Sequence, residues 1–162
     1  MKIVGKYPTT RLRRIRNSEW MRRLISENNL SINDLILPIF IRDGKNKVDK
    51  IKTMPGVFRY SVDKLSLIMN KAKKMKIPMV ALFPYTPKNK KDKHGSEALN
   101  KDNLICRSIK YAKKYYPNIG IMCDVALDPY TSHGHDGVLI NNDVDNDKTI
   151  KILVKQALLQ AE

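Results

Sequence analysis

Apolar blocks and amphipathic stretches alternate along this chain. Three runs are nearly continuous in apolar residues, as strands buried on both faces require: 35–41, 79–84 and 119–127. Three other stretches place apolar side chains at helical spacing: 61–75, 102–116 and a segment from about 147. Strand and helix alternating in this way is the order of a parallel α/β structure. The pattern therefore predicts an α/β fold made of three βα units.

The segments between these blocks predict turns and loops. Residues 42–60 are expected to form a loop around a Pro55-Gly56 turn, and Ser61 is expected to cap the helix that follows. The lysine-rich stretch 85–101 is long for a plain connector, which favours a functional or mobile loop. A further polar loop is expected before the last helix. That helix carries an apolar stripe of Ile150, Leu153, Val154, Ala157 and Leu158.

The N-terminal residues 1–17 are polar and basic, and Pro8 prevents an early helix. We expect an extended arm here, followed by a short helix with Ser18 at its N-cap and with Trp20 and Leu24 on one face. The arm carries four arginines that could bind phosphate or contact another subunit: Arg11, Arg13, Arg14 and Arg16.

Composition sets limits on this picture. At 162 residues the chain is long enough for one domain with a sizeable core, and too short for two ordinary domains. The sequence contains neither an apolar run of membrane-spanning length nor a secretory signal. Its two cysteines, Cys106 and Cys123, give no disulfide framework, so a reducing, cytoplasmic location is expected.

The net charge of +15 has two interpretations. A basic, non-enzymatic protein could bind nucleic acid or an anionic membrane surface by releasing counterions, and this is the alternative function. The lysines are, however, scattered along the chain with asparagine and isoleucine, as compositional bias would produce. Because net charge governs solubility and non-specific association rather than chemistry, we favour the second interpretation and expect neither nucleic acid nor membrane as a partner.

Candidate chemistry gathers around the third apolar run. Asp124 interrupts this run and Asp128 follows it, within the segment DVALDPYTSHGHDG at 124–137. Loops after parallel strands carry the active sites of barrels and open α/β sheets. A carboxylate buried in such a strand must be paired or hydrogen-bonded and tends to have a perturbed pKa. From the residues alone, a structural role for Asp124 is as well supported as a functional one.

The 124–137 segment resembles the metal-site segment of porphobilinogen synthase, which is also called 5-aminolevulinate dehydratase. Further matches follow the family's order along the chain: RLRR at 11–14, DLILPIFI at 34–41, MPGVFRYS at 54–61, VALFP at 80–84, GSEALN at 95–100, DNLICRSI at 102–109 and VKQALLQAE at 154–162. Many separate matches in order are far more specific than one short motif.

The resemblance implies a TIM (β/α)8 barrel, of which residues 18–162 would be the first three βα units, ending before strand 4. Residues 1–17 would be an arm that contacts a neighbouring subunit of a homo-octamer. The implied reaction is the condensation of two 5-aminolevulinate molecules to porphobilinogen, a lyase step in haem and tetrapyrrole biosynthesis. The family's two Schiff-base lysines lie on later strands, and no lysine of this chain matches them. The chain alone is therefore expected to be inactive.

The same resemblance implies site residues. Asp124 matches an active-site aspartate that would favour the charged forms of the Schiff-base lysines. In zinc-dependent members, three cysteines stand where this chain has Ala126, Asp128 and Asp136. Thiolates suit Zn²⁺, whereas carboxylates suit harder cations. The resemblance thus implies the aspartate-type branch, with Mg²⁺ or a monovalent cation near Asp128 and Asp136 instead of an active-site zinc.

Other residues keep two interpretations. His133 and His135 could ligate a metal, but hydrogen bonding that shapes their loop is favoured. Phe83, at the end of the second strand, could line the substrate pocket or belong to the core. Cys123 is expected to be buried and inert, pointing to the face opposite Asp124.

Overall fold

The computed structural model describes residues 5–6, 8–10 and 13–162. The chain divides into two compact units, Met1–Ser31 and Ile32–Glu162. Arg11 and Leu12 of the RLRR motif lie outside the described residues. The expected boundary between arm and barrel, at residues 17–18, stays a prediction.

The first unit contains a short 3₁₀ helix, Arg14–Arg16, and the helix α1, Glu19–Leu24. Ser18 occupies the N-cap position of α1 as expected, but its buried hydroxyl makes no capping hydrogen bond. Arg22 ties α1 to the preceding turn, because its Nη1 donates to the carbonyl of Arg16 at 2.9 Å. Leu24 is 77% exposed, so the apolar face predicted for this helix is open to solvent.

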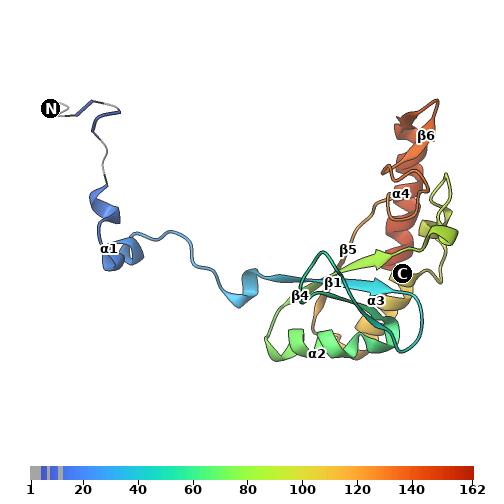
Figure 1. Cartoon of the computed structure of the whole chain (residues 1–162), viewed down its shortest axis with the longest axis horizontal. Helices are drawn as coiled ribbons and strands as arrows, with labels where there is room; N and C mark the ends of the chain where they lie inside the picture. Colours follow the sequence, from blue (N-terminus) through green and yellow to red (C-terminus); the bar gives the residue numbers. More distant parts are fainter. Residues whose placement is uncertain (1–4, 7, 11–12) are drawn as a thin grey trace. The chain divides into compact units, whose positions relative to one another are not determined.

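The second unit is built on a five-stranded sheet with the order β2-β3-β1-β4-β5 (Figure 1). Its strands are β1 (Ile36–Arg42), β2 (Val48–Lys50), β3 (Phe58–Ser61), β4 (Met79–Tyr85) and β5 (Gly120–Cys123). β1 pairs in parallel with β3 and β4, and β4 pairs in parallel with β5, whereas β2 is antiparallel to β3. The mixed α/β class with a parallel sheet is confirmed.

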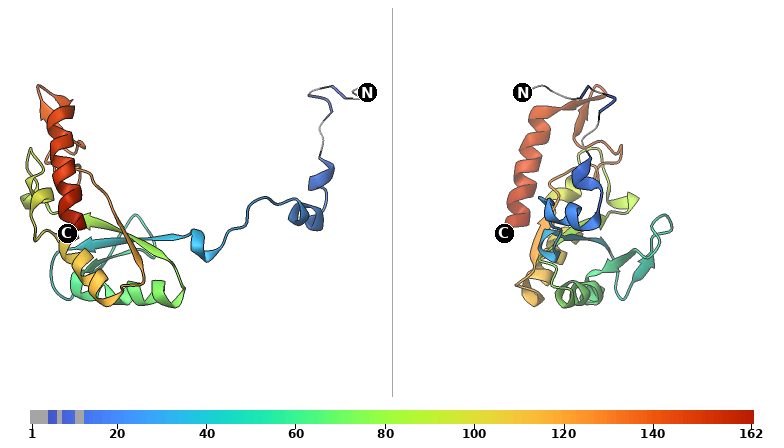
Figure 2. Two further views of the ribbon diagram at one scale, coloured as in Figure 1. Left: turned by 180° about the vertical axis from the view of Figure 1, so that it is seen from behind. Right: turned by 90° about the vertical axis from the view of Figure 1, so that its left-hand side faces the viewer.

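Two helices cover one face of this sheet (Figures 1 and 2): α2 (Ser66–Lys74) and α3 (Leu104–Tyr115). Each lies between successive parallel strands in the chain, because a parallel pair needs a crossover connection. Alternate strand residues such as Ile39 and Leu82 point into this layer, each 1% exposed, and they pack in one cluster with Leu65 and Met69. Burial of these side chains holds the helices to the sheet.

Two expectations for residues 42–75 are wrong. Residues 42–60 are not one loop, because β2 and β3 form within them and β3 extends the sheet beyond β1. Ser61 does not cap a long helix with its side chain. Its buried hydroxyl donates to the carbonyl of Lys47 at 3.2 Å and accepts from the Lys47 N–H at 3.0 Å. A 3₁₀ turn, Val62–Lys64, therefore precedes α2.

A hairpin that the hydrophobic pattern did not predict follows the 124–137 segment. It consists of β6 (Val138–Ile140) and β7 (Asp143–Asp145), paired antiparallel. Asn141 and Asn142 form its two-residue turn, and both have positive φ, as this turn type requires. Gly137 precedes the hairpin, and a Cβ there would lie 2.5 Å from Val144 Cγ1. Glycine is needed at this close approach.

The helix α4 (Asn146–Ala161) lies beside this hairpin rather than against the sheet (Figure 1). Asp145 caps it by accepting a hydrogen bond from the Lys148 N–H at 2.8 Å. The buried side chains of α4 are Thr149 and Gln156. Much of the predicted apolar stripe instead faces solvent, with exposures of 48%, 53% and 63% for Ile150, Val154 and Leu158. Neither α4 nor any other helix in the described part of the chain is long and apolar enough to cross a membrane.

The core makes a simple prediction about Leu65. This side chain is fully buried, whereas Leu67 on α2 is 50% exposed. We expect Leu65→Ala to lower the free energy of unfolding by about 2–5 kcal/mol, because it leaves a cavity between helix and sheet. The matched variant Leu67→Ala should change it by less than about 0.5 kcal/mol. Urea denaturation measures both values, and equal losses would contradict this assignment of the core.

Candidate functional site at the carboxyl ends of the strands

Three segments meet beyond the carboxyl ends of β4 and β5: the loop 86–101, the segment 124–137 and the β6–β7 hairpin. The first two are joined by a parallel bridge between Asp92 and Thr131. Within that bridge the Ser132 N–H donates to the Asp92 carbonyl at 2.8 Å, and the Asp92 N–H donates to the carbonyl of Tyr130 at 3.3 Å. This edge is where parallel α/β folds carry their functional groups.

Asp124 lies just after β5 and not inside a strand. The strand ends at Cys123, and the Asp124 side chain is exposed, so the expectation of a buried strand carboxylate is wrong. β5 pairs on one side only, with β4, and no second ladder extends it toward Leu127. Leu82 and Cys123 are in register and both belong to the helix-covered core. Cys123 thus faces the helix layer, and Asp124 follows it immediately beyond the end of the strand.

Phe83 lies on β4 next to Leu82, on the face of the sheet opposite the helix layer. It is in register with Phe40 of β1, and the two rings pack with their centroids 5.7 Å apart. Both side chains are half-buried. The uncovered sheet face thus presents an aromatic surface close to the start of the Asp124 segment. A role for Phe83 in lining a substrate pocket stays a prediction.

Asp136 folds the 124–137 segment back on itself. Its Oδ1 accepts a hydrogen bond from the backbone N–H of Leu127 at 2.6 Å. Leu127 is fully buried, and its carbonyl accepts from the Thr131 N–H at 2.9 Å, which closes a turn around Asp128. A carboxylate accepting a backbone N–H is a charge-assisted hydrogen bond, and these are among the stronger ones. The fold therefore places Asp128 and Asp136 close together.

Burial and the nearby carboxylates shift the pKa of the Asp128 carboxyl. Burial raises the pKa of the Asp128 carboxyl above its ordinary value of 3.8, and the charges of Asp136 and Asp124 raise it further. A hydrogen bond at its own backbone N–H and the attraction of Lys91 act in the opposite sense without reversing the shift. Like charges held near each other disfavour ionisation of both. The three aspartates of the segment thus form one electrostatic group.

Two glutamines of α4 donate hydrogen bonds to the backbone of the 124–137 segment. Gln156 Nε2 donates to the carbonyl of Ala126 and Gln160 Nε2 to the carbonyl of Asp124, both at 3.1 Å. Residues four apart share one face of a helix, so both bonds need the same orientation of α4. Gln156 is 1% exposed, and its Oε1 has no hydrogen-bond partner. This polar anchoring explains why the buried face of α4 is not its apolar stripe.

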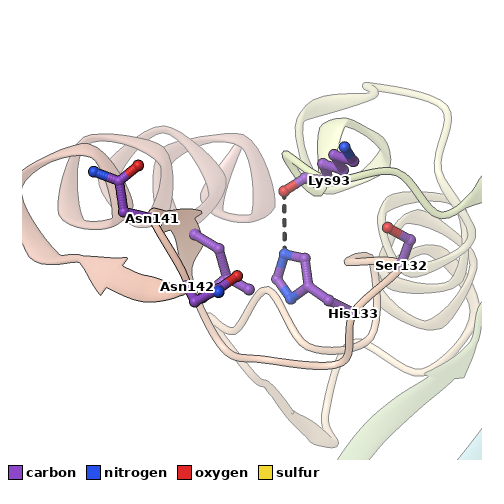
Figure 3. Close-up of a pocket in the computed structure, with 6 residues that line it drawn as sticks. Lys93, Ser132, His133, Asn141 and Asn142 are labelled. Carbon is purple, nitrogen blue, oxygen red and sulfur yellow. Dashed lines mark hydrogen bonds between the residues drawn. The ribbon is translucent and has the colours of Figure 1, made fainter.

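His133 shapes its loop through both ring nitrogens. Its Nε2 lies 3.2 Å from the carbonyl of Lys93 (Figure 3). Its Nδ1 accepts from the His135 N–H at 3.2 Å. This pairing fits the tautomer with hydrogen on Nε2. Thr131 adds a third constraint, because its hydroxyl donates to the His135 carbonyl at 2.8 Å. These contacts support the hydrogen-bonding role that was favoured for His133.

The lysine-rich loop is anchored by ion pairs. Lys90 pairs with Asp43 at 3.0 Å and with Glu97 at 3.2 Å, and Arg107 of α3 pairs with Asp43 as well. Burial alone would raise the pKa of Asp43, but hydrogen bonds from Lys90 and Arg107 outweigh it and lower that pKa. The network joins the loops after β1 and β4 to α3.

Both cysteines are free and unreactive. Cys106 is buried, whereas Cys123 is half-buried and more exposed than expected. Burial, followed by the nearby Cys106 and Asp124, raises the pKa of Cys123 to about 12. The thiolate is the reactive form, so this thiol is inert at neutral pH.

The donors near Asp128 suit a hard cation better than zinc. Ala126 offers no side-chain ligand, and Asp128 and Asp136 offer carboxylate oxygens, which Mg²⁺ prefers. One oxygen of Asp136 is already engaged by Leu127. In the described part of the chain, no group of three or more His, Cys, Asp or Glu side chains is arranged to hold a metal. A cation at these residues would need further ligands.

Sequence reasoning missed two features of this site. Gln156 and Gln160 were not singled out, although their four-residue spacing on a helix was readable from the sequence. The lysine-rich loop was expected to be functional or mobile, but Lys88, Lys91 and Lys93 were not singled out within it, and each lines a pocket beside His133. Their one usable signal was the alternation Lys-Asp-Lys at 91–93.

Fold and site together define a parallel α/β protein with a carboxylate-bearing segment beyond its strand ends, the arrangement found in barrel enzymes. A sequence profile of the family described as "Delta-aminolevulinic acid dehydratase" matches residues 9–162. The relative of that name from Bradyrhizobium diazoefficiens is 51% identical over 152 residues, covering 94% of this chain and 43% of the relative. The one from Chlamydia pneumoniae is 41% identical and is covered over 46% of its length.

A solved structure agrees with these matches. Porphobilinogen synthase from Toxoplasma gondii, crystallised with its reaction product porphobilinogen, superposes with a TM-score of 0.85 at 36% identity. The match covers 94% of this chain and 44% of that one. The chain therefore belongs to the delta-aminolevulinic acid dehydratase family, whose members are also called porphobilinogen synthases. It spans about half the length of the curated relatives it matches.

Charge crowding at Asp128 predicts a stability change. Because its pKa is raised in the folded state, its ionised form destabilises the fold once the pH exceeds the ordinary value of 3.8. We expect Asp128→Asn to raise the melting temperature at pH 7 by roughly 1–3 °C. At about pH 3 the carboxyl is protonated in both the folded and the unfolded state, and the gain should disappear.

Thermal denaturation followed by circular dichroism at both pH values checks this expectation. Asp143→Asn, at an exposed position on β7, is the matched control and should leave the melting temperature unchanged at pH 7. A lower melting temperature for Asp128→Asn at pH 7, or equal gains for both variants, would contradict the account.

Proposed function

We propose that this chain supplies the aspartate-bearing part of a porphobilinogen synthase active site, which condenses two 5-aminolevulinate molecules to porphobilinogen. The observation that carries the proposal is the grouping of Asp124, Asp128 and Asp136 beyond the end of β5, where their charges act on one another. The family membership supplies the reaction, and the product named for the Toxoplasma gondii relative is the molecule expected here.

The aspartates have separate roles in this proposal. Asp124, exposed just beyond the end of β5, would stabilise the charged form of a substrate-binding amine. Asp128 and Asp136 would hold Mg²⁺ or a monovalent cation, which would neutralise the negative charge that now raises the pKa of Asp128. The absence of thiols at these two positions argues against an active-site zinc.

The chain's own lysines do not provide the Schiff-base amine of this reaction. A lysine becomes a nucleophile when its ammonium group is desolvated or placed beside another cation. No lysine in the described part of the chain is buried, and the strands β1, β3, β4 and β5 contain none. We therefore propose that the 162 residues alone do not form porphobilinogen. Assembly into a homo-oligomer and a cytoplasmic location belong to the same proposal.

Complementation tests this proposal. The part of the Bradyrhizobium diazoefficiens relative that this chain does not match would be produced together with the chain, and porphobilinogen formation would be measured. We expect activity from the pair and none from the chain alone. Asp124→Asn should lower that activity about 100-fold, the weight of a well-placed charged group in catalysis.

Two controls make the complementation decisive. The matching part of the Bradyrhizobium relative, produced with its own remainder, shows whether the two parts can assemble. Asp143→Asn tests an exposed aspartate outside the 124–137 segment that carries the three proposed site residues, and it should leave the activity unchanged. Porphobilinogen formed by the isolated chain would refute the inactivity proposal, and full activity of the Asp124→Asn pair would refute the role of Asp124.

A further inference from the structure

Two pockets adjoin the loop at His133, and their charged walls are of one sign. The first has a volume of about 360 Å³ and is lined by Lys93, Ser132, His133, Leu139, Asn141 and Asn142 (Figure 3). The second, of about 430 Å³, shares Ser132 and His133 and adds Lys88, Lys91, Thr131 and Gly134. None of these residues is acidic. We propose that the two pockets form a binding site for a small organic anion that carries phosphate or carboxylate groups.

Two of the lysines are available to such an anion. Within the described residues, the ammonium groups of Lys88 and Lys93 make no hydrogen bond or ion pair, and both side chains are exposed. Lys90, between them, is committed to Asp43 and Glu97. Lys91 is partly committed, because its Nζ donates to the carbonyl of Asp128 at 3.3 Å. The proposal therefore depends on Lys88 and Lys93.

The nearest acid on the same loop is turned away from these pockets. Asp92 stands between Lys91 and Lys93, and successive side chains of an extended segment point to opposite sides. Its Oδ1 accepts from the N–H groups of His94 at 2.8 Å and Ser96 at 3.1 Å. The hydrogen bond from Ser96 is the largest influence and lowers the pKa of Asp92, so it stays ionised while occupied by its own loop. The charged side chains that line the two pockets are thus lysines.

The shared wall of the two pockets is held rigidly. The Asp92–Thr131 bridge and the Ser132 N–H bond to Asp92 fix the two chain segments against each other. His133 uses both ring nitrogens within this framework, so its ring is a spacer between the pockets rather than a donor to the ligand. Ser132 is exposed, and its hydroxyl is a candidate donor. A site fixed in this way needs little ordering when it binds a ligand.

The size of the site limits the ligand class. Pockets of about 300–1,000 Å³ suit small organic molecules. Two pockets that share one wall suit a ligand with two anionic groups, one near Lys88 and one near Lys93. Ammonium groups bind phosphate and carboxylate oxygens through the same charge-assisted hydrogen bonds, so the geometry favours both chemistries. This site does not depend on the proposed enzyme function, since it uses none of the three aspartates of the 124–137 segment.

Calorimetric titration of the 162-residue chain tests the proposal, with pyrophosphate and citrate as separate probes in 0.15 M NaCl. We expect saturable binding of at least one probe. The double variant Lys88→Gln, Lys93→Gln keeps the side-chain stems and should weaken that binding about tenfold or more for each charge lost. The control Lys73→Gln, Lys74→Gln removes the same charge from the exposed side of α2 and should leave the affinity within about twofold.

Each outcome has a definite meaning. Binding of pyrophosphate but not citrate assigns the site to phosphates, and the reverse assigns it to carboxylates. No saturable binding of either probe overturns the proposal. Equal weakening in the two double variants also overturns it, because general attraction to a basic protein would then explain the binding.

Circular dichroism of each variant confirms its folding. The variant Ser132→Ala gives an independent test, with a loss of affinity of about threefold expected for one neutral donor.

Discussion

The hydrogen bond from the Leu127 N–H to the carboxylate of Asp136 is the contact on which the candidate site depends. It closes the segment that follows β5 and brings the acid at 136 back beside the one at 128. This closure carries an electrostatic cost, because partial burial and then the neighbouring charges raise the pKa of Asp128. Sites that gather like charges in this way are candidates for cation binding and catalysis.

The rest of the unit supplies a rigid base for that segment. The parallel strands β3, β1, β4 and β5 share one direction, so the loops that follow β4 and β5 emerge at the same edge. The ion pairs of Asp43 hold the loop after β4, and the bridge from Asp92 to Thr131 joins that loop to the segment. α4 contacts the same segment through the hydrogen bonds that Gln156 and Gln160 donate. Rigid elements thus position a site made of loop residues.

Much of the fold was predictable because long apolar runs and helical spacing are strong local signals. Those signals located β1, β4 and α3 to within two residues at each end. β2, β3 and the β6–β7 hairpin were missed, because strands of three or four residues carry too little periodicity. The turn residues Asn141 and Asn142 were the available clue to the hairpin.

The candidate site was predictable in identity but not in geometry. The 124–137 segment, with its three aspartates, was readable as the place of interest from the sequence alone. The shape of the segment was not readable from the sequence. It depends on contacts of Asp136, Gln156 and Lys91 with residues distant in the sequence, and local patterns do not record such contacts. That much of the apolar stripe of α4 faces solvent was not readable for the same reason. Gln156, which donates to the carbonyl of Ala126, is the buried polar side chain of this contact, and a buried amide needs hydrogen-bond partners.

The most direct test of this account is the pKa of the Asp128 carboxyl, measured by nuclear magnetic resonance in the unmodified protein and in Asp136→Asn. The asparagine keeps an oxygen that can accept from the Leu127 N–H but removes the charge. We predict a pKa above 3.8 in the unmodified protein that falls in the variant yet stays above 3.8, because burial is the larger cause. A pKa at or below 3.8 in the unmodified protein, or one that Asp136→Asn leaves unchanged, would contradict it.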